Sequence, residues 1–275
     1  MSKFQVLCVT MNQKDFSKVN QMNLHSDVIF ANQTNETAYK EYSFEGHTAK
    51  MLSTNTRGVG INRNISLMLA ESEICLFADD DMVYEDDLEE QVVSEFVAHP
   101  DADVIIFNVK TVDDTIRKQK QYTKTRKCSR LERMPWGGVR IAFRLSSVKK
   151  ANIWFTTLFG GGAVYASGED SIWLKEAKRK GLCFYVSSKT IGTVYFDNST
   201  WYTGRDEKLF YARGAYISQI HKSFFGIWSI YYGIRFSKNA KISFIQRIQW
   251  IYNGKKGYDQ LISYEQFKQE RNKLK

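Results

Sequence analysis

Apolar runs that alternate with helical patterns limit the fold of this 275-residue chain more than any other feature of its sequence. Four runs predict buried strands, over residues 5–10, 27–31, 74–78 and 104–109. Two helices are predicted by apolar spacing, one from Ile61, Ile65, Met68 and Leu69 and one from Leu88, Val92 and Phe96. Strands that alternate with helices predict an α/β fold, with a mostly parallel sheet flanked by helices.

The rest of the chain divides into a polar middle and a helical end. Residues 110–150 are polar and basic, with weak periodicity. A helix is expected to run to Lys180 and to end at Gly181, and a strand follows over residues 182–186. From Tyr211 onward the pattern indicates aromatic-rich helices. The domain prediction is a main domain over residues 1–205, with halves of about 1–110 and 111–205, and a helical C-terminal region over residues 206–275.

The net charge of +9 is concentrated in one stretch. Residues 208–258 contain nine Lys or Arg and no Asp or Glu, among many aromatic and aliphatic side chains. Apolar runs that are too short to span a bilayer, combined with basic residues, predict helices lying on an anionic membrane surface. The residues expected to contact the membrane are Phe224, Phe225, Trp228, Lys238, Lys241 and Arg247. Ordinary packing of the aromatic side chains within the protein is the alternative.

Other features concern the compartment and the partners. The first apolar run is too short for a signal peptide and lacks a cleavage site. The four cysteines are far apart and form no C-x-x-C pair, which predicts reduced thiols. We therefore expect a cytoplasmic protein that is attached peripherally to the inner face of the cell membrane. A nucleic-acid partner is not expected, because no DNA-binding or RNA-binding signature accompanies the basic stretch.

Three consecutive carboxylates, Asp79, Asp80 and Asp81, end the predicted strand over residues 74–78. In open α/β sheets, ligands bind beyond the carboxyl ends of the strands. Adjacent carboxylates repel one another unless a cation lies among them, and hard oxygen ligands favour Mg²⁺ or Mn²⁺. The alternative is a turn in which an aspartate caps the following helix.

A second acidic element, Glu169-Asp170, opens a predicted helix after a glycine-rich loop at Gly160, Gly161 and Gly162. A carboxylate in this position could take a proton from a substrate hydroxyl group. Acidic residues are also common in the first turn of a helix, where the helix dipole stabilises them. Glycines in a loop are equally compatible with a mobile turn.

In this order, these motifs make the chain resemble the family 2 glycosyltransferases of the GT-A fold, and most of all the bacterial enzymes that build capsular, exo- or lipopolysaccharide chains. The resemblance covers nearly the whole chain. Its landmarks are VTMNQKD, ANQTNE, RGVGINRN, FADDDMVYEDDL, LFGGGAVYASGEDSIWL and NSTWYTGRDEKLFYARGA. The acidic strand end and the Gly-Glu-Asp element, taken together, are the most specific of these.

The resemblance implies the transfer of one sugar from a nucleotide-sugar, most often a UDP-sugar, to a hydroxyl group of a lipid-linked or saccharide acceptor. It further implies inversion at the anomeric carbon and a Mn²⁺ or Mg²⁺ cofactor. Residues 1–110 would then bind the nucleotide, and residues 111–205 the acceptor. The Q-x-x-R-W element of processive synthases is missing, which argues for single transfers.

The resemblance also implies a role for each matching position. The base pocket would be lined by Thr10, Asn12, Asn32 and Gln33, and the diphosphate supported by Arg57. Asp79 and Asp80 would face the ribose and the sugar, and the metal ligands would be Asp81, Asp79 and Asp197. Asp197 replaces the histidine that many relatives place there. Asp170 would be the catalytic base, Glu169 would contact the acceptor, and Gly160, Gly161 and Gly162 would form the acceptor loop.

Two other functions compete with this interpretation. Sugar-phosphate nucleotidyltransferases have a related α/β core, but their first loop is rich in glycine, whereas this chain has TMNQKDFSK there. An inactive, membrane-attached partner of a polysaccharide machine would not need the carboxylates that this chain retains.

Overall fold

The computed structural model describes residues 3–112, 120–129, 132, 137–195, 204, 206–221 and 223–273. The chain forms two compact units, one of residues 1–156 with 170–199 and one of residues 157–169 with 200–275. The segment 157–169, which the sequence pattern assigns to the main domain, thus belongs to the C-terminal unit. A contact between distant segments accounts for this: the hydroxyl group of Tyr165 donates a hydrogen bond of 3.0 Å to the carbonyl oxygen of Gly257 in α8 (Phe244–Gln260).

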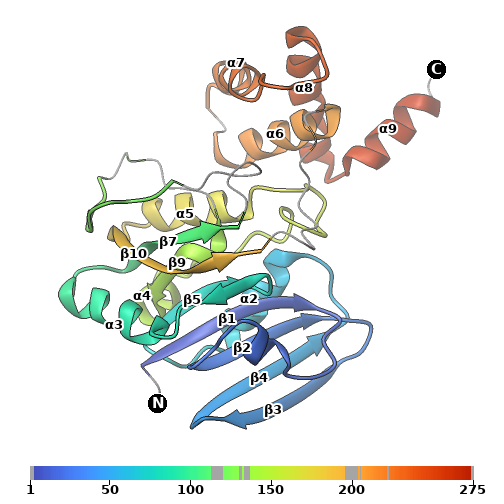
Figure 1. Ribbon diagram of the computed structural model, residues 1–275. Helices are drawn as coiled ribbons and strands as arrows, with labels where there is room; N and C mark the ends of the chain where they lie inside the picture. Colours follow the sequence, from blue (N-terminus) through green and yellow to red (C-terminus); the bar gives the residue numbers. More distant parts are fainter. Residues whose placement is uncertain are drawn as a thin grey trace. The chain divides into compact units, whose positions relative to one another are not determined.

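Among the described residues, ten strands form one sheet in the order β3-β4-β2-β1-β5-β9-β7-β10-β6, with β8 beside β10 (Figure 1). The strands are β1 (Phe4–Met11), β2 (Asp27–Gln33), β3 (Ala38–Phe44), β4 (His47–Thr54), β5 (Ile74–Asp79), β6 (Met82–Tyr84), β7 (Val104–Thr111), β8 (Arg126–Lys127), β9 (Ile141–Arg144) and β10 (Phe184–Val194). The four predicted strands β1, β2, β5 and β7 are confirmed, and the strand predicted over residues 182–186 is found as β10, which begins at Phe184 and continues to Val194.

The direction of the strands corrects one detail of the prediction. Strands β4, β2, β1 and β5 run parallel, and β7 is parallel to β10. Strand β9 pairs antiparallel with both β5 and β7, and β3, β6 and β8 also pair antiparallel. The α/β fold is confirmed, but the sheet is mixed, because the polar middle of the chain contributes β9 to its centre.

The helices of the first unit are α1 (Lys18–Gln21), α2 (Val59–Leu69), α3 (Leu88–Ala98), α4 (Leu145–Lys150) and α5 (Glu169–Arg179), whose first residue belongs to the second unit. A short 3₁₀ helix, η1, spans Gly138–Arg140. The second unit contains α6 (Glu207–Ile220), α7 (Phe225–Arg235), α8 (Phe244–Gln260) and α9 (Tyr264–Lys273).

The sheet has a hydrophobic core on each face, because alternate residues of a strand point to opposite sides. On one face, Phe4, Val6 and Cys8 of β1 pack in a cluster with α3, and on the other Leu7 packs in a cluster with α2, α4 and α5. Trp173 of α5 is fully buried in the second cluster. Helices therefore cover both faces of the sheet, as expected.

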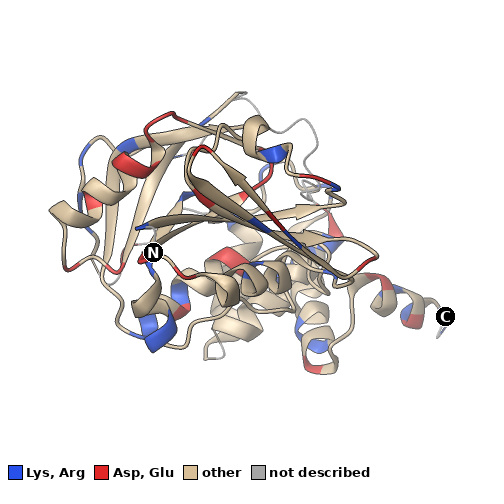
Figure 2. Ribbon diagram, turned by 90° about the horizontal axis from the view of Figure 1, so that it is seen from below, with Lys and Arg blue, Asp and Glu red and all other residues tan. Residues whose placement is uncertain are grey.

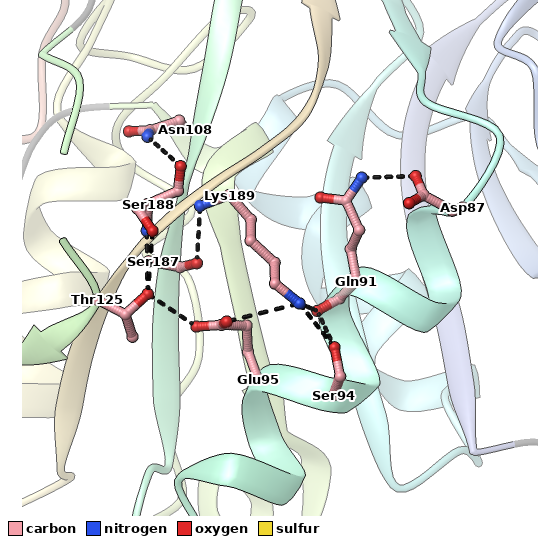
Figure 3. Close-up of polar contacts among 9 residues, drawn as sticks. All are labelled: Asp87, Gln91, Ser94, Glu95, Asn108, Thr125, Ser187, Ser188 and Lys189. Atoms are coloured by element: carbon pink, nitrogen blue, oxygen red, sulfur yellow. Dashed lines mark hydrogen bonds and ion pairs between the residues drawn. The ribbon is translucent and has the colours of Figure 1, made fainter. Parts of the chain in front are cut away.

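Helix α3 confirms its predicted apolar face, since Leu88, Val92 and Phe96 are all buried. Polar contacts join its other side to β10 (Figure 3). Lys189 donates a hydrogen bond of 2.8 Å to the hydroxyl of Ser94 and lies 3.6 Å from the Glu95 carboxylate. These contacts fix α3 against the sheet directly after the acidic strand end.

Helix α2 contradicts its predicted apolar face. Met68 is 64% exposed, and Ile61, Ile65 and Leu69 are only half-buried. The buried side is instead formed by Gly60, Asn62, Arg63, Ser66 and Leu67. The reason is that this polar side faces charged and backbone groups of the first unit, which satisfy the buried Arg63.

In the second unit, α6 and α8 pack backbone against backbone. A Cβ atom on Gly254 would overlap the carbonyl oxygen of Tyr211, and one on Gly214 would overlap that of Ile251. Within the described part of the chain, no helix has both the length and the apolar character needed to cross a membrane.

Candidate active site

Three parallel strands end at the same edge of the sheet and bring the candidate residues together. The pairing of β1 with β2 places Thr10 opposite Asn32, and the pairing of β1 with β5 places Val9 opposite Asp79. Asp80 and Asp81 follow directly, and the hydroxyl group of Thr10 donates a hydrogen bond to the Asp80 carboxylate. The edge predicted from sequence to bind a ligand therefore gathers these side chains.

Arg63 of α2 lies at the centre of this site and is completely buried. Its guanidinium donates a hydrogen bond of 2.9 Å to the Asp79 carboxylate and another to the Asp170 carboxylate. The guanidinium also lies 5.2 Å from the ring centroid of Phe155. A planar guanidinium can bind two carboxylates at once, so Arg63 connects the end of β5 with the first turn of α5.

Only glycine fits opposite Arg63 on the η1 side. A Cβ atom on Gly138 would lie 2.6 to 2.8 Å from the guanidinium atoms of Arg63. The backbone of Gly138 also hydrogen-bonds the Asp170 carboxylate. The position of Arg63 is thus set by α2, β5, α5 and the loop before β9 together.

Asp170, the predicted base, is 5% exposed. Burial raises the pKa of its carboxyl group, and the charge of Asp79 adds to this rise. The charge of Arg63 and the hydrogen bond from Arg63 both oppose it. The arrangement sets a buried carboxylate of raised pKa beside a guanidinium that opposes this rise and orients the carboxylate, which suits a group that takes a proton from a hydroxyl.

Asp81 has the electrostatics of a metal ligand. Burial, together with the charges of the neighbouring Asp79 and Asp80, raises the pKa of its carboxyl group to about 7. Its buried Oδ1 has no hydrogen-bond partner among the described residues. An unpartnered carboxylate oxygen next to Asp79 and Asp80 fits a divalent cation. The cation would compensate the burial of the Asp81 carboxylate and its repulsion by the two neighbouring carboxylates.

The full ligand set is not assembled by the described residues. No group of three or more His, Cys, Asp or Glu among them is arranged to hold a metal ion. Asp79 is paired with Arg63, and Asp197 lies outside the described residues. One or two protein carboxylates still match Mg²⁺ and Mn²⁺, which commonly complete their shell with water and substrate phosphates.

The residues expected around the nucleotide base lie at the ends of β1 and β2 and at the start of the loop after β1. The Asn32 side chain is fully buried, accepts a hydrogen bond of 3.0 Å from the backbone of Gln13 and donates one of 2.9 Å to Ser53. Gln33 accepts one of 2.9 Å from the backbone N–H of Gly58. Asn12 is exposed and has a positive φ of 55°, and its backbone N–H bonds Gln33. The side chains of Asn32 and Gln33 therefore hold the backbone of two neighbouring loops in place, at Gln13 and at Gly58.

Arg57, the expected diphosphate contact, lies on the surface before α2. Its guanidinium donates a hydrogen bond of 2.7 Å to the side chain of Asn35 and a longer one to the carbonyl oxygen of Thr34. Lys18 of α1 is a further cation of the site, since its ammonium donates a 2.9 Å hydrogen bond to the backbone oxygen of Asp80.

Glu169 and the glycine loop belong to the second unit. Glu169 is 1% exposed and accepts a 3.0 Å hydrogen bond from the backbone N–H of Gly168. Gly160 and Gly162 have positive φ values of 108° and 78°, and a 2.8 Å hydrogen bond from Gly160 to Tyr165 closes the loop. The loop needs glycine for this backbone conformation.

Sequence reasoning missed Arg63, Lys18 and Gly138. A signal for Arg63 exists in the chain: Asn62, Arg63 and Ser66 form a polar stripe at helical spacing on a helix that directly precedes the acidic strand. The contact of Gly138 with Arg63 has no local signal, because it depends on a fold that brings together residues 75 positions apart in number.

Comparisons with known proteins concern the family and the fold. Residues 23–157 match a family model described as Glycosyl transferase family 2. No curated protein sequence matches the chain significantly. The chain is similar in structure to S. aureus TarS 1-349 in complex with UDP-GlcNAc, with 16% identity and a TM-score of 0.56 over 96% of this chain and 93% of that one.

Two further structures of the same protein are similar. For S. aureus TarS 1-349 in complex with UDP, the identity is 15% and the TM-score 0.58, over 96% of this chain and 93% of that one. For the longer S. aureus TarS, the identity is 16% and the TM-score 0.54, over 96% of this chain and 45% of that one. At these identities the likeness shows the shared fold.

Proposed function

We propose that this chain, a family 2 glycosyltransferase of the GT-A fold, transfers a single sugar from a UDP-sugar to a hydroxyl group of its acceptor, with inversion. The observation that carries the proposal is the buried pairing of Arg63 with Asp79 and Asp170. It joins an acidic strand end, where a donor would lie, to a carboxylate of raised pKa, which would act on the acceptor.

The donor side of the proposal rests on the strand ends. The loops held in place by Asn32 and Gln33 would bind the base, with Thr10 and Asn12 beside it. Asp79 and Asp80 would face the ribose and the sugar, and Arg57 would lie on the diphosphate side. Asp81 would hold Mn²⁺ or Mg²⁺, which when bound supplies positive charge against the departing diphosphate. The UDP and UDP-GlcNAc complexes of TarS support a uridine nucleotide as the donor.

On the acceptor side, Asp170 would accept the proton of the attacking hydroxyl group. The hydroxyl oxygen then bonds to the anomeric carbon from the face opposite the leaving nucleoside diphosphate, which inverts that carbon. Arg63 keeps the Asp170 carboxylate oriented and offsets part of the increase in its pKa. Glu169 and the loop at Gly160, Gly161 and Gly162 would contact the acceptor.

The acceptor is proposed to be lipid-linked or an oligosaccharide, within the synthesis of a capsular, exo- or lipopolysaccharide. This follows from the sequence resemblance. The missing Q-x-x-R-W element supports one transfer per binding event. We place the reaction at the inner face of the cell membrane, because residues 208–258 carry only basic charges among apolar side chains.

The replacement Asp170→Asn tests the proposal. We expect donor affinity to stay nearly constant, while turnover falls by roughly two to four orders of magnitude, since the amide cannot accept the proton. Calorimetry with UDP measures the first quantity, and release of UDP in the presence of Mn²⁺ and an acceptor measures the second. Asp101→Asn, at an exposed carboxylate that pairs with Lys127, is the matched control. Undiminished turnover would remove Asp170 from the mechanism and direct attention to Glu169.

A further inference from the structure

Helix α7 exposes a continuous apolar stripe. Ile227, Ile230 and Ile234 are 66%, 51% and 60% exposed, and their spacing places them on one side of the helix. Tyr231 is exposed beside them. Aliphatic side chains gain by leaving water, so a stripe of this size on a helix surface is typical of a binding surface.

The opposite side of α7 is occupied by packing against α8. Ser229, Tyr232 and Gly233 are buried, and a Cβ atom on Gly233 would lie 3.0 Å from Ile248 and 3.3 Å from the ring of Phe244. The exposed stripe is therefore the side of α7 that α8 leaves uncovered. Ile245, the neighbour of Phe244, is 70% exposed, and Phe224 at the start of α7 is 74% exposed. We call Phe224, Ile227, Ile230 and Ile234 the apolar face.

The segment that carries the apolar face has charges of one sign. Lys238 and Lys241 follow α7 directly and are both exposed. No Asp or Glu occurs from residue 208 to residue 258. By contrast, α9 carries acidic and basic residues together, visible as red and blue segments on the helix that leads to the C-terminus in Figure 2. An apolar surface on a segment that carries only cations complements a surface that is apolar inside and anionic at its rim.

Three residues expected at a membrane have other roles. The Phe225 ring packs on Tyr252, with centroids 5.2 Å apart, and the Trp228 ring stacks on His221 at 3.7 Å. Arg247 donates a hydrogen bond of 2.8 Å to the carbonyl oxygen of Gly233 and so joins α8 to α7. These three side chains hold the helices of the second unit together, and the proposal below does not depend on them. Phe224, Lys238 and Lys241 remain at the surface.

We propose that the apolar face inserts into the headgroup region of an anionic lipid leaflet, with Lys238 and Lys241 contacting lipid phosphates. This proposal specifies the surface behind the membrane attachment given under the proposed function, and it does not depend on the transferase chemistry. The apolar side chains supply the insertion, and the lysines make it selective for anionic lipids.

Co-sedimentation of the full chain with lipid vesicles tests the proposal. We expect binding to vesicles of phosphatidylcholine mixed with phosphatidylglycerol, weaker binding to phosphatidylcholine alone, and release as the salt concentration rises. Ile227→Ser combined with Ile230→Ser should weaken binding to both kinds of vesicle. Lys238→Glu combined with Lys241→Glu should weaken binding to the mixed vesicles by more than about tenfold and leave the weak binding to phosphatidylcholine unchanged.

The controls carry equivalent changes elsewhere. Val97→Ser alters another exposed aliphatic residue, which is 73% exposed on α3, and Lys3→Glu with Lys150→Glu reverses two exposed charges of the first unit. Circular dichroism checks that each variant is folded. Equal binding to both vesicle types, or unchanged binding of the isoleucine variant, would overturn the proposal. So would a dimer in light scattering that the isoleucine variant abolishes, without vesicle binding, because a second copy would then cover the face.

The release of UDP in solution, measured on the same samples, separates the two proposals. If the protein releases UDP from a UDP-sugar but does not bind vesicles, only the membrane-docking proposal is contradicted. A chain that binds vesicles as described but never turns over a UDP-sugar contradicts the transferase proposal alone.

Discussion

Arg63 binds two carboxylates at once, and it is the cation that compensates the charge of the buried Asp170. Asp79 and Asp170 come from segments 91 positions apart in number, and the guanidinium neutralises both. A buried ion pair contributes little net stability, because desolvation offsets its attraction, but the loss of one partner leaves a buried charge uncompensated. The role of Arg63 is therefore best seen in the pKa of Asp170.

The replacement Arg63→Met should shift the pH dependence of turnover. Without the guanidinium, the pKa of Asp170 rises beyond the increase that burial already causes. A base works in its deprotonated form, so activity is present above this pKa and is lost as the pH falls through it. The acidic limb of the kcat profile should therefore move to higher pH. We also expect the free energy of unfolding to fall by about 3–5 kcal/mol.

Two variants frame this test. Arg63→Lys keeps a positive charge, so its acidic limb should lie between those of the unmodified chain and of Arg63→Met. It also tests the role of Arg63 if Arg63→Met folds poorly. Arg179→Met removes an exposed arginine that pairs with Glu176 on α5, and should leave the profile as it is. An acidic limb that stays in place in both Arg63 variants would mean that Arg63 has no part in setting the base.

At this scale the sequence predicts the acidic residues but not their partners. Asp79, Asp80 and Asp81 stand out because three carboxylates at the end of an apolar run are rare, and Asp170 because the resemblance marks it. Arg63 is not predicted as a site residue, because Ile61 and Ile65 on the same helix suggest the wrong buried face. A buried cation becomes evident only when the fold shows which carboxylates surround it.

Among the elements, α6 and α8 depend on two glycines for their close approach. A methyl group on Gly254 would overlap the backbone of Tyr211, which cannot yield without moving α6. We expect Gly254→Ala to lower the free energy of unfolding by about 1–3 kcal/mol, as overpacking does. Chemical denaturation monitored by tryptophan fluorescence measures this change.

Gly226 of α7 provides the matched control. A Cβ atom there would meet only the hydroxyl group of Tyr252, at an ordinary 3.5 Å. Gly226→Ala should thus be neutral or stabilise the protein by up to about 1 kcal/mol, because alanine loses less backbone entropy on folding. Similar losses of stability in both variants would show that helix α6 can shift to accommodate the new side chain.

Elements with a strong period are predictable, and those without one are not. The apolar run of β5 and the spacing of Leu88, Val92 and Phe96 in α3 identify both elements. Strands β3 and β4 were not predicted: β3 is exposed along most of its length, and β4 alternates between half-buried and buried residues of mixed polarity. Strand β9 has only four residues within a polar region.

For the molecule as a whole, ligand binding should appear as thermal stability. A ligand that binds only the folded chain at about 100 times its Kd adds about 2.7 kcal/mol to the free energy of unfolding. We expect one UDP-sugar, with Mn²⁺, to raise the Tm more than other nucleotide-sugars in a thermal-shift screen. EDTA should remove most of the increase, since Asp81 and the diphosphate would share the ion.

Asp81→Ala serves as the internal check of this screen. It should bind the same UDP-sugar with little further gain from Mn²⁺. A gain from Mn²⁺ as large as in the unmodified chain would rule out Asp81 as the ligand.

The α/β class and the position of the site follow from the sequence at this scale, whereas the grouping of residues 157–169 with the C-terminal helices depends on contacts between distant segments.

The antiparallel strand β9 has a consequence for how the chain folds during synthesis. Strands β5 and β7 hydrogen-bond β9 on its two sides, yet β9 leaves the ribosome only after both. Until residue 144 emerges, β5 has one unpaired edge and β7 has two, and such edges can pair with other chains. Strand β10 joins β7 later still. The half of the sheet from β9 to β10 is thus completed last, and a nascent chain that pauses before residue 141 exposes edges that are prone to aggregation.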